Sequence, residues 1–169
     1  MHKFLYPVLL ALACLGVVSC GTPRSHFTYI ADLPLKELDL PDQSWQRSPL
    51  RANAQYILFG AQSGKERKNK LGDYYFVNWY DAFPKQPTSI QMLYTQAGTA
   101  SQVLTHEVRF DAPRRSRGSR KTVLAFNGIE RAKRGDILSW RMNLIVNGQI
   151  VDTRRSYLWR DNEKHTKAE

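Results

Sequence analysis

The sequence predicts an all-β protein, built as a single seven-stranded antiparallel β-sandwich. Between residues 55 and 159, short runs of β-branched and aromatic residues alternate with turn signals, and no stretch shows a convincing helical period. The 169 residues, of which 42% are hydrophobic and 24% charged, suffice for one domain with its own core. A mean hydropathy of −0.49 excludes a protein with many membrane spans.

Residues 1–19 predict a signal peptide. Basic Lys3 precedes an apolar run from Phe4 to Val18, and small Ser19 follows the run. The run is shorter than the roughly 20 residues that a helix needs to cross a bilayer, so a permanent span is not expected. The chain is therefore expected to be exported.

The four residues ending at Cys20, Val-Val-Ser-Cys, resemble the lipobox of bacterial lipoproteins. The resemblance implies that the Cys20 sulfur carries diacylglycerol, with palmitate-type acyl chains, and that the signal is removed just before this cysteine. Because Gly21 rather than Asp follows the cysteine, the resemblance also implies anchoring in the outer membrane of the bacterial cell envelope, facing the periplasm. The alternative is an ordinary signal peptide that happens to contain Cys20.

The rest of the domain plan follows from composition. Residues 20–53 carry four prolines among polar and apolar residues, which predicts a tether that is partly docked on the domain. The β-sandwich is expected at residues 54–160 and a charged tail at 161–169. The chain has two cysteines. Loss of Cys14 with the signal and use of Cys20 for lipid would leave no thiol for a disulfide or for catalysis.

The seven strands are expected, in order, at residues 55–60, 74–81, 89–96, 102–110, 121–126, 136–146 and 149–159. The sixth has the clearest alternation, which predicts one core-facing set: Leu138, Trp140, Met142, Leu144 and Val146. Further core residues are expected in the second and third strands: Val77, Trp79 and Tyr94.

Asn147-Gly148 predicts a tight hairpin between the last two strands, because a type I′ turn needs positive φ at both central residues. In the resulting register, Val146 opposes Gln149 and Arg141 opposes Arg154. Like charges directly across a strand pair repel each other. This pair therefore needs an acidic neighbour such as Asp152, a bulge, or an anionic ligand, and both arginines are candidates for anion binding.

The segment from Tyr74 to Tyr94 resembles the fibronectin type III pattern. A strand ending in Trp79 is followed by a loop with Pro84 and Pro87 and by a strand that contains Tyr94. The resemblance covers about twenty residues and implies a sandwich of the immunoglobulin or fibronectin type III class. The antibody-type core cysteines are absent, so a transthyretin-like sandwich and a small closed barrel stay open as alternatives.

The sequence shows no recognisable catalytic pattern, and we expect no catalytic residue, metal or cofactor. Neither a nucleophile elbow nor a His-Glu-x-x-His spacing occurs. His106 and Glu107 should point to opposite faces of one strand. Asp73 and Asp136 each follow a glycine, which favours turn hydrogen bonding. The alternative is an interfacial enzyme that acts on lipid or glycan in a pocket around His106.

The chain carries 25 Lys and Arg against 15 Asp and Glu, and much of the excess lies in residues 65–70, 114–121 and 131–134. In a fibronectin-like strand order, the first and third clusters share one pole. That pole gives the candidate anion-binding residues Lys65, Arg67, Lys68, Lys70, Arg131, Lys133 and Arg134. Expected partners are anionic lipid, a cell-wall polymer or an acidic envelope protein, whereas export argues against nucleic acid. The sequence thus favours a non-enzymatic envelope lipoprotein that binds or scaffolds another component; loops that merely solubilise the protein are the alternative.

Overall fold

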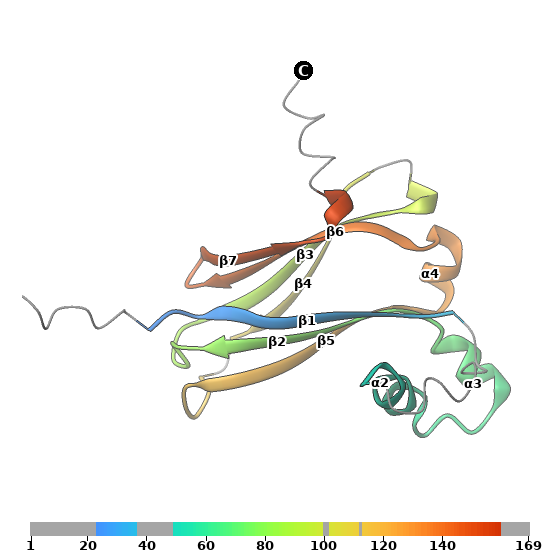
Figure 1. Ribbon diagram of the computed structural model, residues 1–169, viewed down its shortest axis with the longest axis horizontal. Helices are drawn as coiled ribbons and strands as arrows, with labels where there is room; N and C mark the ends of the chain where they lie inside the picture. The colour runs from blue at the N-terminus through green and yellow to red at the C-terminus, as the bar shows by residue number, and fades with distance from the viewer. Residues whose placement is uncertain (1–22, 37–48, 100–101, 112, 160–169) are drawn as a thin grey trace, which may run out of the picture.

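The computed structural model describes residues 23–36, 49–99, 102–111 and 113–159, which form two antiparallel sheets packed face to face (Figure 1). The first sheet has the order β1 (His26–Leu35), β2 (Gly72–Asp81), β5 (Gly118–Asn127). The second has the order β4 (Leu104–Phe110), β3 (Thr88–Gln96), β6 (Ile137–Val146), β7 (Gln149–Arg155). The prediction of a predominantly β protein with two packed sheets is confirmed.

The core lies between the sheets, and its most deeply buried members are Phe27, Val77, Trp79, Ile90, Met92, Leu124, Met142 and Leu144. Tyr94 is also buried, as the alternation predicts, and Trp140 is half-buried against Tyr75. The prediction for Leu138 is wrong, because this side chain is 52% exposed. A bulge in the β3–β6 ladder makes Ile137 oppose Gln96, so Ile137 packs against the core and Leu138 faces outward.

β1 lies within the range expected as a tether, and it is hydrogen-bonded along β2 from His26 to Leu35. It forms the edge of its sheet, which explains why Pro34 is tolerated inside it. Leu33 and Leu35 are buried on the outer face of this sheet. The chain therefore enters the sandwich within a few residues of Cys20.

The strand predicted at residues 55–60 is wrong, because this segment falls mostly in the helix α2 (Pro49–Leu58). Ala54 is fully buried, and Ile57 and Leu58 pack with it against Leu33, Leu35 and Tyr74. The spacing 54, 57, 58 is that of one helix face, and it places α2 over the outer face of the β1–β2–β5 sheet (Figure 1). This short apolar stripe carries a helical period that the β-rich composition concealed.

Shorter helical segments include α3 (Gly64–Asn69), η2 (Ala97–Thr99) and α4 (Gly128–Arg134). α3 begins with a capping box, in which the Ser63 hydroxyl accepts from the Glu66 amide at 3.2 Å and the Glu66 carboxylate accepts from the Ser63 amide at 3.1 Å. These bonds fix the start of a helix that has no buried residue of its own.

The β6–β7 hairpin follows the predicted turn but not the whole predicted register. Asn147 and Gly148 have φ of 50° and 78°, as the Asn-Gly signal requires. Val146 opposes Gln149 and Ile145 opposes Ile150, but an irregularity then makes Leu144 oppose Asp152. Every pair beyond this bulge is shifted by one residue, so Arg141 opposes Arg155.

Candidate functional site

The first and third basic clusters meet at one end of the sandwich, which we call the helical end: the part of the molecule formed by residues 56–71 and 128–136. α3 and α4 lie together there, and the Gly128 amide donates to the Leu71 carbonyl at 3.4 Å (Figure 1). The second cluster lies where β5 begins, opposite the end of β2, at the far end of the strands. The predicted segregation of the clusters is therefore present.

Two basic side chains at the helical end, Arg131 and Lys70, make ion pairs or hydrogen bonds within the protein. The Arg131 guanidinium contacts the Asp73 carboxylate at 3.3 Å and also the Asp136 carboxylate. The Lys70 ammonium donates to the carbonyls of Ile57 and Phe59 at 2.7 and 2.8 Å. Lys70 thus links the end of α3 to α2, and Arg131 links α4 to β2 and to the start of β6, so both charged groups have partners within the protein.

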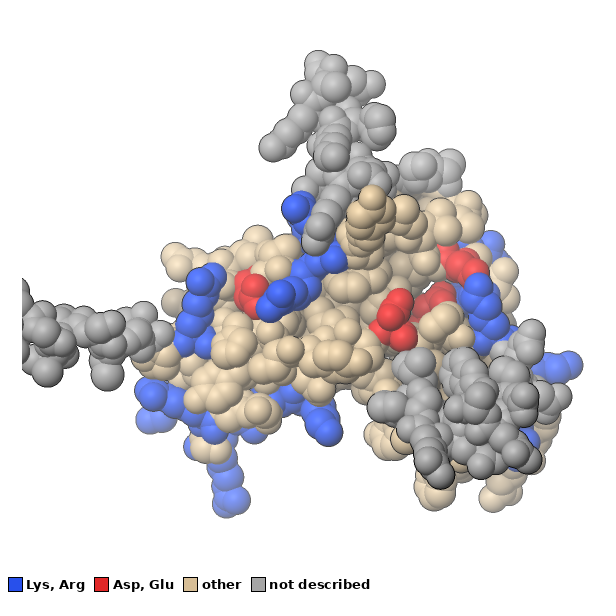
Figure 2. All heavy atoms as spheres, viewed as in Figure 1, with Lys and Arg blue, Asp and Glu red and all other residues tan. Residues whose placement is uncertain are grey.

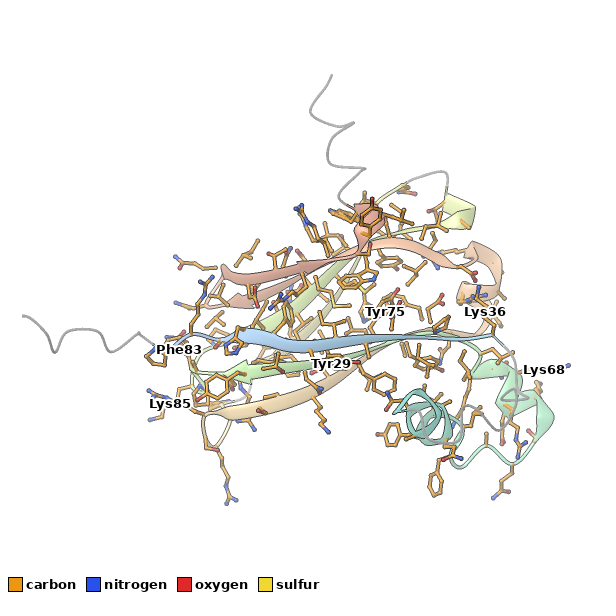
Figure 3. The ribbon with its side chains drawn as sticks, viewed as in Figure 1. Tyr29, Lys36, Lys68, Tyr75, Phe83 and Lys85 are labelled. Atoms are coloured by element: carbon orange, nitrogen blue, oxygen red, sulfur yellow. The ribbon has the colours of Figure 1, made fainter. Side chains whose placement is uncertain are left out.

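Lys65, Lys68 and Lys133 are exposed, and none of their side chains makes an ion pair or hydrogen bond within the described part of the chain. Lys68 extends away from the body of the protein at this end (Figure 3). Arg67 donates to the Ala61 carbonyl at a long 3.4 Å, and Arg134 is exposed in the last turn of α4. The free charge of the helical end is therefore centred on three lysines on two neighbouring helices.

Large apolar side chains are also exposed at this end of the sandwich, a feature that the sequence reasoning missed. Tyr56 is 72% exposed, Phe59 85% and Ile129 70%. Tyr56 and Phe59 lie in and just after α2, and Ile129 lies in α4. The interpretation of residues 55–60 as a strand had assigned Tyr56 and Phe59 to a sheet. The helical end is thus both cationic and apolar.

Arg141 and Arg154 do not form the cross-strand pair that the sequence predicts. Arg154 opposes Met142, donates to the Phe27 carbonyl at 3.4 Å and lies 4.0 Å from the Asp152 carboxylate. Arg141 instead lies 5.6 Å from the ring centroid of Trp159. Because of the bulge, the two arginines lie on different faces of the sheet, and the predicted pairing of Arg141 with Arg154 is wrong.

The opposite end, which we call the loop end, is formed by residues 81–87, 110–120 and the 147–148 turn. Asp81 is fully buried there, and its carboxylate accepts from Arg114 at 2.6 Å, with Arg120 at 3.7 Å. The Arg114 guanidinium also donates to the Phe110 and Gln86 carbonyls and to the Thr88 hydroxyl, each at 2.9 Å. Arg114 is therefore a structural residue.

A hollow of about 210 Å³ opens between the sheets and is lined by residues including Asp32, Asp73, Tyr75 and Asp136. Figure 2 shows acidic side chains around a hollow on this face. Burial raises the pKa of Asp73, although Arg131 opposes this shift. Lys36, 2.6 Å from Asp136, lowers the pKa of that carboxyl. Tyr75 is only 4% exposed, and burial together with Asp73 and Asp32 raises its pKa.

His106 and Glu107, the residues considered for catalysis, make contacts with neighbouring side chains. The His106 ring packs edge-on against Phe126, with centroids 5.2 Å apart, and lies on the strand face of Leu104 and Val108. Glu107 is paired with Arg109 at 2.9 Å. Across the described ranges, no group of three His, Cys, Asp or Glu side chains is arranged to hold a metal ion.

Two predictions concern the N-terminal region and the membrane. Cys20 and the signal peptide lie outside the residues that the structure describes. Among the described helices, none is long and apolar enough to span a bilayer. Comparison of the chain with protein-family models, with characterised proteins and with solved structures found no significant match.

Proposed function

We propose that this chain is a non-enzymatic bacterial envelope lipoprotein, anchored through Cys20, that uses its helical end to bind an acidic partner protein. The observation that carries the proposal is that Lys65, Lys68 and Lys133 are exposed at the same end of the sandwich as the exposed Tyr56 and Phe59. Exposed aromatics flanked by cations are typical of protein interfaces, where buried aromatic anchors supply affinity and charges steer association.

The proposal includes an immunoglobulin or fibronectin type III class for the sandwich. Support comes from the strand orders β1-β2-β5 and β4-β3-β6-β7, which correspond to the A-B-E and C′-C-F-G sheets of a fibronectin type III domain. The buried Trp79 on the second strand adds to this support. Domains of this architecture commonly serve as binding modules on cell surfaces.

An acidic protein fits the helical end better than a phosphate polymer does. A polymer would be held by charge alone, and Phe59 and Ile129 would stay exposed to water after it bound. A protein partner can cover these side chains and pair its carboxylates with the surrounding lysines. The positive net charge of the chain, +10, favours association with acidic surfaces in general.

The test uses a photo-crosslinking amino acid in place of Phe59 in intact cells, followed by purification of the captured protein. Binding is then measured with the variant Lys65→Gln, Lys68→Gln, Lys133→Gln. The matched control is Lys85→Gln, Arg115→Gln, Arg117→Gln, which removes the same charge at the loop end. We expect the first variant to weaken binding at least tenfold and to flatten its salt dependence, while the control changes it less than twofold.

Phe59→Ala provides the second arm, because an aromatic anchor at an interface contributes more than about fivefold to affinity. If both charge variants weaken partner binding equally, the attraction depends only on net charge, which would contradict a binding site at the helical end. Retention of polyphosphate binding that depends on the three lysines but not on Phe59 would favour a polymer ligand and contradict the protein partner.

A further inference from the structure

We infer that the loop end of the sandwich rests on the phospholipid surface that holds the anchor, so that the helical end is presented away from it. This inference depends on the lipidation of Cys20 in the proposed function. The surface that the loop end contacts is an anionic phospholipid bilayer.

The connection between Cys20 and the sandwich is short. β1 begins at His26, so only residues 21–25 separate the strand from Cys20. At 3.3–3.6 Å per residue, a fully extended connection spans at most about 20 Å. His26 pairs with Tyr80 at the loop end, and Leu35 pairs with Gly72 at the helical end. A ten-residue strand covers about 30 Å. Any membrane that holds Cys20 is thus close to the loop end.

The loop end also carries exposed basic side chains that are not paired with carboxylates in the described residues. Lys85, Arg115 and Arg117 are exposed and make no ion pair within the described residues, whereas Asp111 is the exposed carboxylate in this group of loops. Figure 3 shows Lys85 and Phe83 at this end, where β1 also begins. Each basic residue near an anionic lipid surface raises partitioning about fivefold.

The buried carboxylate of Asp81 does not reduce the positive charge that the loop end exposes. Asp81 is held by Arg114 and Arg120, so its charge is cancelled inside the protein and does not oppose an anionic surface. The exposed charge of the loop end is therefore positive. An acyl anchor together with a basic patch is a combination that gives stable membrane attachment.

The experiment uses the full lipidated protein, reconstituted into phosphatidylethanolamine vesicles with or without phosphatidylglycerol. Single thiols are introduced at exposed neutral positions, Ser116→Cys at the loop end and Ala132→Cys on α4, and each is labelled with a fluorophore. Lipids with a nitroxide on the headgroup act as short-range quenchers. We expect the label at position 116 to be quenched several-fold more than the label at position 132, with a larger difference when phosphatidylglycerol is present. Equal quenching, or stronger quenching at position 132, would overturn the inference.

Charge variants and acyl labelling distinguish a wrong orientation from a missing lipid anchor. Combining the loop-end substitutions Lys85→Gln, Arg115→Gln and Arg117→Gln with Ser116→Cys should reduce quenching, while the helical-end triple should not. Incorporation of an alkyne fatty acid, lost in Cys20→Ser, reports the anchor itself. Absence of acylation would overturn both the inference and the lipoprotein proposal. Acylation without preferential quenching at position 116 would overturn only the orientation and leave the proposed partner binding intact.

Discussion

The buried pair between Arg114 and Asp81 gives the sharpest stability prediction. Asp81 is fully buried, and the Arg114 side chain is only 13% exposed. Arg114→Ala would leave a buried carboxylate with Arg120 at 3.7 Å and the Phe83 amide, which donates to it at 3.2 Å. It would also remove donors from the Phe110 and Gln86 carbonyls. Breaking a buried pair in this way costs about 3–5 kcal/mol of unfolding free energy, a large part of the total for one domain.

The assay is thermal and urea unfolding of Arg114→Ala beside Arg115→Ala, which removes the same charge one residue further along. At about 3 °C per kcal/mol, the first variant should melt on the order of 10 °C below the parent protein. The exposed control should stay within about 0.5 kcal/mol. If the two variants melt together, Arg114 does not hold Asp81 in solution. A double variant, Asp81→Leu with Arg114→Met, should recover much of the loss, because the fully buried carboxylate is then absent.

Two further predictions test the strand pairing and the acidic hollow. Gly72→Ala should lower the unfolding free energy by on the order of 3 kcal/mol, because the added carbon would lie 2.2 Å from the Phe126 carbonyl oxygen. The control is Gly64→Ala, whose added carbon meets nothing within 4 Å. This variant should be neutral or slightly stabilising in the same unfolding assay. Carboxyl-carbon NMR titration should give Asp136 a pKa below its ordinary value and Asp73 one above it, and the reverse order would contradict the burial and pairing described. The two carboxyls therefore affect the pH dependence of the unfolding free energy in opposite ways. The contribution of Asp136 to stability is lost as pH falls through its folded pKa. The stability associated with Asp73 falls as pH rises from its ordinary pKa to its raised one.

The strands that alternate clearly were predictable, and the exceptions have local causes. β2, β3 and β6 lie close to their expected ranges, because period-two patterns with one buried face specify both element and register. The β6–β7 register was predicted only as far as Ile145 and Ile150, since the turn sets the first pairs and a bulge at the next residues has no sequence signal.

The errors in the N-terminal half come from prolines and from a short helix. Proline spacing in residues 20–53 argued against a central strand, yet an edge strand such as β1 can keep Pro34. For α2, the buried spacing of Ala54, Ile57 and Leu58 spans little more than one turn, too few residues to outweigh the β-branched and aromatic content around it.

At the helical end, the sequence predicted that two basic clusters meet but not which charges are used internally. The carbonyls of Ile57 and Phe59 reach Lys70 only because α2 is a helix. Asp73 and Asp136, expected to make turn hydrogen bonds, converge on Arg131 because β2 and β6 begin at the same end of different sheets. Such long-range partners are set by tertiary structure, which local patterns do not encode.

The pairing of β1 also determines how the protein responds to mechanical load. If the anchor at Cys20 and a partner at the helical end are pulled apart, the force enters at His26 and acts along the strand axis. The hydrogen bonds between β1 and β2 run across that axis from His26 to Leu35, so they share the load in shear and do not open one after another. The strand nearest the anchor is thereby suited to transmit tension through the sandwich without unzipping.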